Sequence, residues 1–295
     1  FRPGRSAHQA VAEAQRYMAE GYRWVVDIDL EKFFDRVNHD RLMARVATRV
    51  KDKRMLKLIR AYLNAGVMDD GLEEPTVEGT PQGGPLSPLL SNIVLDELDR
   101  ELERRRHRFV RYADDCNIYV RSERAGKRVM ESVTRFIERK LKLKVNRTKS
   151  AVGRPWRRTL LGFSFTNGKE PKRRVAPEAL SRFKKRVREL TRRSRSISTE
   201  QRVAQVRRYL LGWRGYFGFA QTPAVFELLD SWIRRRLRAA IWKQGRRGTT
   251  RFATFRRMGL SERLAAAAAG SGRSAWHYSR NRAINAALPN AYFTS

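Results

Sequence analysis

Two adjacent carboxylates, Asp114 and Asp115, lie between strand-forming residues in the string "RYADDCNIYV". A tight turn between strands would explain one Asp, because its side chain can bond the turn backbone. Two neighbouring carboxylates repel each other unless a cation lies close to them. A second pair, Asp27 and Asp29, lies in the apolar run "VVDIDL", where an unpaired charge is costly to bury. Both pairs therefore indicate a site for a divalent cation.

The chemistry of such a site follows from its oxygen ligands. Mg²⁺ prefers carboxylate oxygens and keeps phosphate oxygens as further ligands. Two such ions about 3.5–4 Å apart can activate a 3′-hydroxyl and stabilise the leaving pyrophosphate in an in-line displacement. We therefore predict two Mg²⁺ ions as cofactors, with Mn²⁺ as an alternative, acting on a phosphate.

The net charge of the chain favours a polyanionic partner. Lys and Arg number 64 against 30 Asp and Glu, which gives a formal net charge of +34 over 295 residues. Such an excess is typical of proteins that bind nucleic acid or an acidic membrane surface. No apolar run approaches the roughly 18 residues that span a bilayer, so we expect no membrane partner.

The charge is unevenly distributed along the chain. Residues 1–166 contain 34 Lys and Arg and 23 Asp and Glu, whereas residues 167–295 contain 30 and 7. The string "TNGKEPKRRVAPEA", with its Gly and Pro, lies at this change. We therefore expect two domains with these bounds, the second of which has an almost purely cationic surface.

The elements that position the acidic pairs are short strands and helices. Residues 22–30 are predicted as a buried strand, 38–65 as two helices, and "HRFVRYADDCNIYVRS" as two strands joined at the Asp pair. A long helix follows a Gly- and Pro-rich loop, with Ser87 as its predicted N-cap and Pro88 at its first position. The pattern indicates an α+β domain on a largely antiparallel sheet, followed by an all-helical part.

Cysteine and histidine usage excludes other kinds of site. Cys116 is the only cysteine, so no disulfide can form within the chain and a reducing compartment is expected. The four histidines are far apart and have no cysteine partners, which argues against structural zinc. The chain starts with "FRPGR" rather than Met, and we expect it to begin inside a longer protein.

Several strings follow one another in the order found in reverse transcriptases: "DIDLEKFFDRVNHD", "TPQGGPLSPLLSNIVLDELD", "RYADDCNIYV", "LKVNRTKS" and "LLGFSF". "FRPGRSAHQA" resembles the fingers motif of group II intron-encoded enzymes. "YLLGWRGYFGFAQTPAVFELLDSWIRRRLRAAIWKQ" resembles their maturase (X) domain, which also forms the thumb. The chain thus resembles a bacterial group II intron-encoded reverse transcriptase/maturase, with no Cys-rich endonuclease domain visible. This resemblance implies a right-hand palm with partial fingers, followed by an all-α thumb, and a cytoplasmic, nucleoid-associated location.

The resemblance also implies which carboxylates are catalytic. Asp29, Asp114 and Asp115 would be the catalytic residues and the metal ligands, joined by the carbonyl of Leu30. Asp29 is favoured over Asp27 by its spacing to Phe34. The family has a bulky residue five positions after this catalytic carboxylate, and Phe34 is five positions after Asp29. In the family this ring lies beneath the incoming sugar and selects deoxynucleotides; a core aromatic is the alternative.

Further roles are carried over in the same way. Lys149 would reach the triphosphate, with a solvated lysine as the alternative, and Gln82 and Gly83 would line the template–nucleotide pocket. The predicted nucleotide-binding residues are Arg2, Arg5, Phe34, Gln82, Gly83 and Lys149.

The resemblance places the nucleic-acid contacts downstream. Leu161, Gly162 and Phe163 resemble the primer grip, which orients the primer end. For each Arg or Lys of the thumb, the alternative interpretation is a solvated residue on a helix face that contacts no RNA. Trp213 and Tyr216 are expected in the core. The predicted RNA-binding residues are Arg207, Arg208, Arg214, Arg234, Arg235, Arg236 and Lys243.

The sequence therefore predicts an RNA-directed DNA polymerase that extends a DNA primer or target on an RNA template with dNTPs. By resemblance it is also a maturase that binds its intron RNA for splicing and retrohoming. Two alternatives stay open: a host-adapted relative that serves repair or defence, and an RNA-binding splicing factor with weak polymerase activity.

Overall fold

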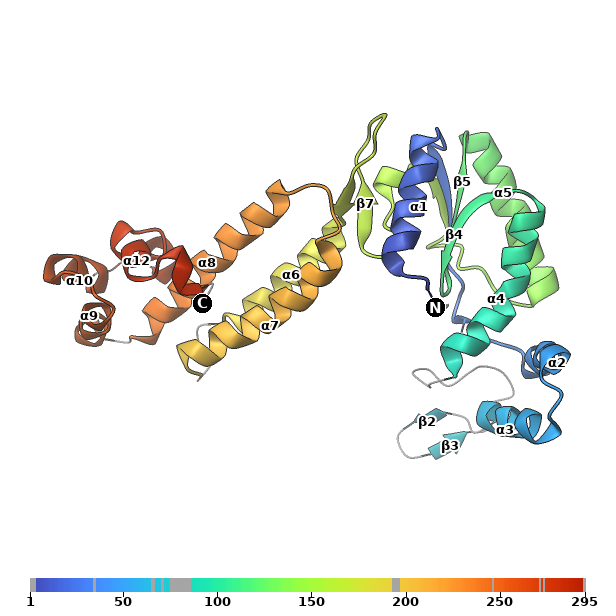
Figure 1. Ribbon diagram of the computed structural model, residues 1–295, viewed down its shortest axis with the longest axis horizontal. Coiled ribbons are helices and arrows are strands. Elements are labelled where there is room, and N and C mark those ends of the chain that lie inside the picture. The colour runs from blue at the N-terminus through green and yellow to red at the C-terminus, as the bar shows by residue number, and fades with distance from the viewer. Residues whose placement is uncertain are drawn as a thin grey trace. The chain divides into compact units, whose positions relative to one another are not determined.

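The structure is a computed structural model of the chain (Figure 1). It describes residues 4–33, 36–64, 67–69, 72–74, 86–192, 197–245, 247–270, 272 and 274–293. The chain divides into two compact units, residues 1–173 and 174–295. The predicted boundary after residue 166 lies earlier in the chain than this division, between the strands at 163–165 and 173–175.

A four-stranded sheet forms the centre of the first unit. Every pairing in it is antiparallel, and the register joins Ile28 to Cys116 and Tyr112 to Asp115. This confirms the predicted antiparallel sheet and the two strands joined at the Asp pair. The order of the strands is β4 (Arg108–Tyr112), β5 (Asp115–Val120), β1 (Trp24–Ile28) and β6 (Ala151–Gly153).

Different helices cover the two faces of this sheet (Figure 1). On one face, Ile28 and Ile118 belong to one buried cluster with residues of α4 (Ser87–Arg104), α5 (Glu123–Phe136) and the π-helix η2 (Ile137–Leu141). On the other face, Tyr119 contacts Tyr17 of α1 (Ala7–Ala19), with 5.6 Å between ring centroids. Side chains alternate along a strand, so Asp27 lies on the α1 face.

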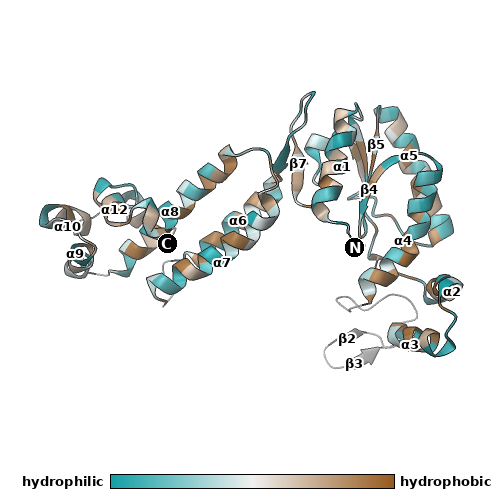
Figure 2. Cartoon of the chain, in the orientation of Figure 1, coloured by the Kyte–Doolittle hydropathy of each residue, from teal (hydrophilic) through white to brown (hydrophobic). Residues whose placement is uncertain are grey.

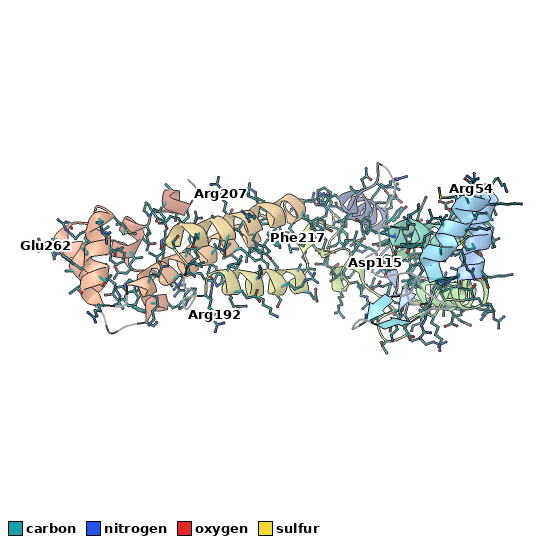
Figure 3. All side chains as sticks on the ribbon, turned by 90° about the horizontal axis from the view of Figure 1, so that it is seen from below. Arg54, Asp115, Arg192, Arg207, Phe217 and Glu262 are labelled. Atoms are coloured by element: carbon teal, nitrogen blue, oxygen red, sulfur yellow. The ribbon has the colours of Figure 1, made fainter. Side chains whose placement is uncertain are left out.

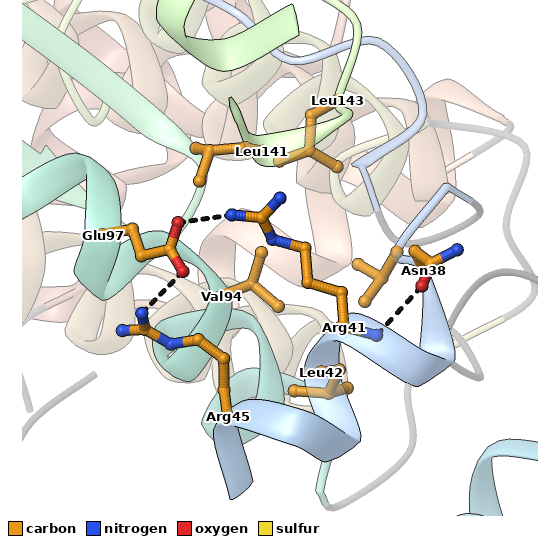
Figure 4. A pocket seen from close by; sticks show the side chains of 9 residues that line it. Asn38, Arg41, Leu42, Arg45, Val94, Glu97, Leu141 and Leu143 are labelled. Atoms are coloured by element: carbon orange, nitrogen blue, oxygen red, sulfur yellow. Dashed lines mark hydrogen bonds and ion pairs between the residues drawn. The ribbon is translucent and has the colours of Figure 1, made fainter. Parts of the chain in front are cut away.

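Two short helices precede α4, as predicted. They are α2 (His39–Arg49) and α3 (Lys53–Asn64), and Asn38 caps α2 by accepting the Arg41 backbone N–H at 3.0 Å. Glu97 of α4 accepts hydrogen bonds from the guanidinium groups of Arg41 and Arg45, at 2.5 and 2.6 Å (Figure 4). These ion pairs join α2 to α4. The short strands β2 (Val67–Asp69) and β3 (Leu72–Glu74) pair with each other in an antiparallel manner.

The predicted N-cap of α4 is wrong. Leu86 occupies the cap position and makes no side-chain capping bond, and Pro88 is the second residue of the helix rather than the first. Ser87 is the first residue of the helix and is buried, and its carbonyl accepts a hydrogen bond from Ser91 Oγ at 2.6 Å. A buried serine inside the helix cannot present its hydroxyl to the helix end in the way that a cap does.

A small hairpin spans the division of the chain after residue 173. The 3₁₀ turn η3 (Pro155–Arg157) leads to β7 (Phe163–Phe165), which pairs with β8 (Arg173–Val175). Arg23, which directly precedes β1, donates hydrogen bonds to the Gly168 carbonyl and to Asn167 Oδ1. These bonds attach the loop of this hairpin to the start of β1.

Three helices form the first half of the second unit: α6 (Pro177–Leu190), α7 (Thr199–Phe217) and α8 (Ala224–Gln244). Phe183, Val206 and Ile233, one from each helix, belong to a shared buried cluster. Each of these three helices has hydrophobic and hydrophilic residues on different sides, as expected for amphipathic helices (Figure 2). Trp213 packs against Phe183 of this cluster with 4.3 Å between centroids, as expected. Tyr216 is half-buried and meets its neighbour Phe217 edge-on, so its expected place in the core is not confirmed.

Short helices surround the end of α8. They are α9 (Gly248–Arg257), α10 (Glu262–Ala269), α11 (Ala275–Tyr278), α12 (Arg282–Ala287) and the 3₁₀ turn η4 (Asn290–Phe293). Ala265 and Ala268 of α10 are fully buried beside Trp242, whose indole N–H donates to the Ala268 carbonyl at 2.9 Å. The predicted α+β fold with a helical second domain is confirmed. Within the ranges described, no helix is long and apolar enough to cross a bilayer.

Candidate active site

The sheet brings the predicted catalytic carboxylates to one end of its central strands. Ile28 pairs with Cys116, so Asp29 and Asp115 follow as the next neighbours across the β1–β5 pair. Directly opposed residues of an antiparallel pair have Cβ atoms roughly 5 Å apart. Asp114 lies in the turn that precedes Asp115. Asp29 and the Asp114–Asp115 pair, which are far apart in the sequence, thus lie at one end of the two central strands.

The turn that carries Asp114 contains an unusual backbone conformation. Ala113 and Asp114 form the two-residue connection between paired Tyr112 and Asp115, and Ala113 has φ of 55°. This left-handed conformation costs a residue with a Cβ atom about 1–2 kcal/mol. The surrounding structure must therefore hold the turn in place.

Arg111 supplies that support. Its Nε and Nη2 donate to the two carboxylate oxygens of Asp99 on α4, both at 2.6 Å. Its Nη1 donates to the Ala113 carbonyl at 2.7 Å and to Asn92 Oδ1 at 3.1 Å. The side chains of Arg111 and Asp99 are only 6% and 12% exposed. Sequence reasoning missed this cluster, because its members are 12 and 19 residues apart and follow no periodic pattern.

The carboxylates raise one another's affinity for protons. The pKa of Asp115 is raised to about 6, first by loss of hydration and then by the negative charges of Asp114, Asp27 and Asp29. Asp115 nevertheless keeps an exposed surface (Figure 3). Burial also raises the pKa of Asp27, and the Arg158 guanidinium, with Nε 3.1 Å from Asp27 Oδ2, opposes that rise. A cation beside Asp115 would relieve this repulsion.

The loop at residues 146–150 also packs beside the carboxylates, where it bonds to the backbone of Asp29. The Asp29 carbonyl accepts the backbone N–H of Asn146 at 2.8 Å, and the Asp29 N–H donates to Ser150 Oγ at 3.0 Å. Asn146 Oδ1 in turn accepts the backbone N–H of Lys149 at 3.2 Å. This bonding places Lys149 Nζ 3.5 Å from Asp29 Oδ2, on a side chain that is 71% exposed. The loop therefore brings an exposed cation to a predicted metal ligand.

The donor set suits Mg²⁺, although it does not form a closed site. Among the described residues, no three His, Cys, Asp or Glu side chains converge on one point where a metal could be held. Mg²⁺ is usually held by one or two carboxylates together with substrate phosphates and water, so the site needs no third protein carboxylate. Leu30 has a buried side chain and forms an isolated bridge with Val145. A role for its carbonyl as a ligand stays a prediction.

Of the six predicted nucleotide-binding residues, the structure describes only Arg5 and Lys149. Arg5 is exposed near the start of α1, and Lys149 lies at the carboxylates. The remaining predicted nucleotide contacts lie outside the described residues: Arg2, Phe34, Gln82 and Gly83.

The predicted primer grip is a second strained turn. Leu161 and Gly162 have φ of 52° and 79°, and Leu160 and Phe163 exchange both backbone hydrogen bonds across them, at 2.8 and 2.9 Å. Phe163 is fully buried and its ring meets His8 edge-on at 6.1 Å. Only the turn residues Leu161 and Gly162 therefore keep surface at which a primer could bind.

The predicted RNA-binding cations fall into two groups. Four of them are exposed on α7 and at the end of α8: Arg207, which is labelled in Figure 3, and Arg208, Arg214 and Lys243. On α8, Arg234 pairs with Asp230, and Arg236 donates to Thr191 Oγ1 at 2.7 Å. Arg235 donates to the Trp276 carbonyl at 3.0 Å and stacks on the Trp276 ring at 3.7 Å. The three half-buried α8 arginines are thus already engaged within the protein.

Comparisons with known proteins agree with this arrangement. Residues 1–165 match the family "Reverse transcriptase (RNA-dependent DNA polymerase)", and residues 180–259 match "Group II intron, maturase-specific domain". Protein YkfC of Escherichia coli K12 is 33% identical over 190 residues, covering 52% of this chain and 50% of that protein. Group II intron-encoded protein LtrA of Lactococcus lactis subsp. cremoris is 43% identical over 100 residues, covering 34% and 16%.

A solved telomerase of Candida tropicalis, in complex with a fragment of telomeric RNA, overlaps 96% of this chain and 48% of its own. The identity is 12% and the TM-score 0.47, too low to support a conclusion. The matched segments span half or less of the lengths of YkfC and LtrA. The family match covers more than half of the chain and contains every predicted catalytic carboxylate. The chain therefore belongs to the reverse transcriptase (RNA-dependent DNA polymerase) family and carries the maturase-specific domain of group II introns.

Proposed function

We propose that the chain polymerises DNA on an RNA template, with Asp29, Asp114 and Asp115 as its catalytic carboxylates. The observation that carries this proposal is that Asp29 and the Asp114–Asp115 turn lie together at one end of the central strands. Divalent ions bound there would activate the primer 3′-hydroxyl and stabilise the leaving pyrophosphate. Mg²⁺ is the cation that fits a site of two or three carboxylates open to phosphate.

The residues around the carboxylates have separate tasks in this proposal. Lys149 ion-pairs with Asp29, and its exposed side chain would turn to the triphosphate of a dNTP. The Leu161–Gly162 turn, whose two residues are half-exposed, would hold the primer end. Arg158 neutralises Asp27 and donates to the Lys149 carbonyl at 3.0 Å, so it would limit the negative charge of the site and steady the lysine loop.

The test is primer extension on an RNA template with dNTPs and Mg²⁺. The parent protein is expected to extend the primer, and a variant carrying both Asp114→Ala and Asp115→Ala is expected to give no extension. Asp40→Ala is the matched control, because it also removes a carboxylate of the first unit, but one that is 82% exposed and paired with Arg60. Extension by the Asp114→Ala, Asp115→Ala variant at the parent's rate would refute the proposed site.

We further propose that the second unit binds intron RNA as a maturase. Its support is the maturase-specific match at residues 180–259 together with the exposed cations Arg207, Arg208 and Arg214. Binding that depends on these charges must weaken steeply with salt, because each neutralised phosphate releases counterions. A filter-binding titration against a group II intron RNA, from 50 to 500 mM salt (roughly tenfold in ionic strength), should show this dependence. A flat response, or equal affinity for an unstructured RNA of the same length, would contradict the proposal.

The same pair of assays separates the remaining alternatives. Tight RNA binding without extension by the parent would favour an RNA-binding splicing factor. Extension without preference for intron RNA would favour a host-adapted polymerase.

A further inference from the structure

We propose that Arg111, with Asp99 and Asn92, is a positioning unit that holds the Asp114–Asp115 turn in the shape needed to bind metal. This inference rests on the proposed function of the carboxylates. It assigns a role to side chains that touch neither substrate nor metal and act through the backbone of Ala113.

The energetics of the Arg111–Asp99 pair show that it is not an ordinary surface contact. Both side chains are almost fully withdrawn from water, and the guanidinium fork meets the carboxylate with two bonds of 2.6 Å. Burying two charges costs desolvation energy that their attraction only partly returns, so an apolar pair of similar size is often at least as stable. Stability alone therefore gives little reason for ions at this place.

The third and fourth bonds of Arg111 supply a reason. Nη1 donates to the Ala113 carbonyl at 2.7 Å and to Asn92 Oδ1 at 3.1 Å. The Ala113 carbonyl and the Asp114 N–H belong to one planar peptide unit, so fixing this oxygen orients the backbone on which Asp114 begins. Asp99 and Asn92 both lie on α4, and they fix the guanidinium itself. A chain of contacts thus runs from a buried helix to the metal-binding turn.

The conformation of the turn explains why it needs this support. Ala113 has φ of 55°, which is unfavourable for alanine, and Asp114 and Asp115 repel each other across the same turn. Without Arg111, the peptide can relax toward a conformation with negative φ, which moves Asp114 away from Asp29. Groups that orient metal ligands from behind are typically worth about 10–100-fold in metal affinity.

The test replaces the buried ions without leaving one of them unpaired. In the test variant, Arg111→Leu is combined with Asp99→Leu, which keeps the volume apolar and removes the donor to Ala113. In the matched control, Arg45→Leu is combined with Glu97→Leu, which removes another arginine–carboxylate pair, between α2 and α4, without contact to the turn (Figure 4). Full-length proteins are compared by Mn²⁺ titration with electron paramagnetic resonance, without nucleic acid. Hydrogen–deuterium exchange of the metal-free hairpin 108–120 is measured in parallel.

The inference expects Mn²⁺ to bind the test variant about 10–100-fold more weakly than the parent, and the control variant as tightly as the parent. It also expects faster amide exchange around residues 112–116 in the test variant alone. Arg111→Lys keeps the charge opposite Asp99 but loses the planar fork, so it should weaken Mn²⁺ binding even if the double variant fails to fold.

Two results would overturn the inference, and they are distinguishable. Test variants that fold, exchange and bind Mn²⁺ like the parent would show that Arg111 only attaches β4 to α4, while the proposed polymerase would stand. A parent that binds no Mn²⁺, or whose binding survives Asp114→Ala with Asp115→Ala, would refute the proposed metal site and this inference together.

Discussion

The two units of this protein use arginine in different ways. In the first, arginines meet carboxylates: Arg111 pairs with Asp99, and Arg158 with Asp27. In the second, residues 174–295 contain 6 acids for 27 Lys and Arg, and several arginines meet neutral groups instead, although Arg234 pairs with Asp230. Arg238 donates to the Leu288 carbonyl at 3.0 Å, and Arg251 lies 3.7 Å above the Trp242 ring.

This difference shows that net charge overstates the surface available to RNA. Carbonyls, hydroxyls and aromatic rings take the place of missing acids and hold guanidinium groups without neutralising them. Arg235 and Arg236 contribute to the formal charge of +34, yet their nitrogens are bonded within the fold. The exposed arginines of α7, rather than the total charge, define the candidate RNA surface.

The largest expected effect is the loss of a buried partner in the first unit. Arg111→Met alone leaves Asp99 charged and buried without its bidentate partner, which should destabilise the first unit by about 3–5 kcal/mol. Arg45→Met removes an arginine that is 29% exposed and should cost about 1 kcal/mol or less. Urea unfolding monitored by circular dichroism measures both. Equal costs would remove the distinction between buried and exposed pairs.

The corresponding substitution in the second unit should cost less. Arg235→Met removes donors from the Trp276 carbonyl and Ser279 Oγ but leaves no charge unpaired. We expect a loss of about 1–3 kcal/mol by the same unfolding measurement, the usual cost of unsatisfied polar groups. A cost as large as that of Arg111→Met would mean that neutral partners hold arginine as firmly as carboxylates do.

Exposed arginines should show the opposite behaviour. Arg207→Ala with Arg208→Ala should change stability by about 0.5 kcal/mol or less. The slope of log affinity for RNA against log salt should become shallower by about 1–2, because two phosphate contacts are lost. The control is Arg235→Met, which should lower stability without changing this slope. An unchanged slope in the double variant would exclude α7 from the RNA surface.

The smallest effect is a dependence on pH that comes from the crowded acids. The folded pKa of Asp115, about 6, is higher than its ordinary value of 3.8. The stability that Asp115 contributes is therefore fully present below pH 3.8 and is lost as pH rises through 6. His107, whose pKa is lowered from 6.5 by burial, opposes this trend, so parent and Asp115→Asn must be compared at each pH. In metal-free protein, the stability of the parent relative to this variant should rise from pH 7 to pH 5; a constant difference would contradict the shift.

Local patterns allowed much of the first unit to be predicted. The two strands around Asp114 and the helices on either side of residue 51 follow from alternation and helical spacing, which act over a few residues. The proximity of Asp29 to Asp115 came from the family resemblance, because strand register is a long-range property. Ser87 satisfied the usual rule for a cap, but burial of the helix start overrode it.

The contacts that were not predicted share one property. The partners of Arg111 lie on a helix upstream of its strand, and the partner of Asp27 lies in a loop more than a hundred residues later. No spacing rule links such positions. An arginine in the middle of a strand next to a metal motif is the one sequence signal that could have prompted a search for a buried acid.

The alanine tract of α10 has a consequence for how this protein can change over generations. Five identical letters from 265 to 269 resemble a spacer that could drift freely. Ala266 and Ala267 are exposed and can accept most helix-forming residues, whereas Ala265 and Ala268 are completely enclosed. Each added methylene at those two positions would overfill the packing around Trp242 and cost about 1–3 kcal/mol. Substitution rates along this uniform stretch should therefore differ sharply from one alanine to the next.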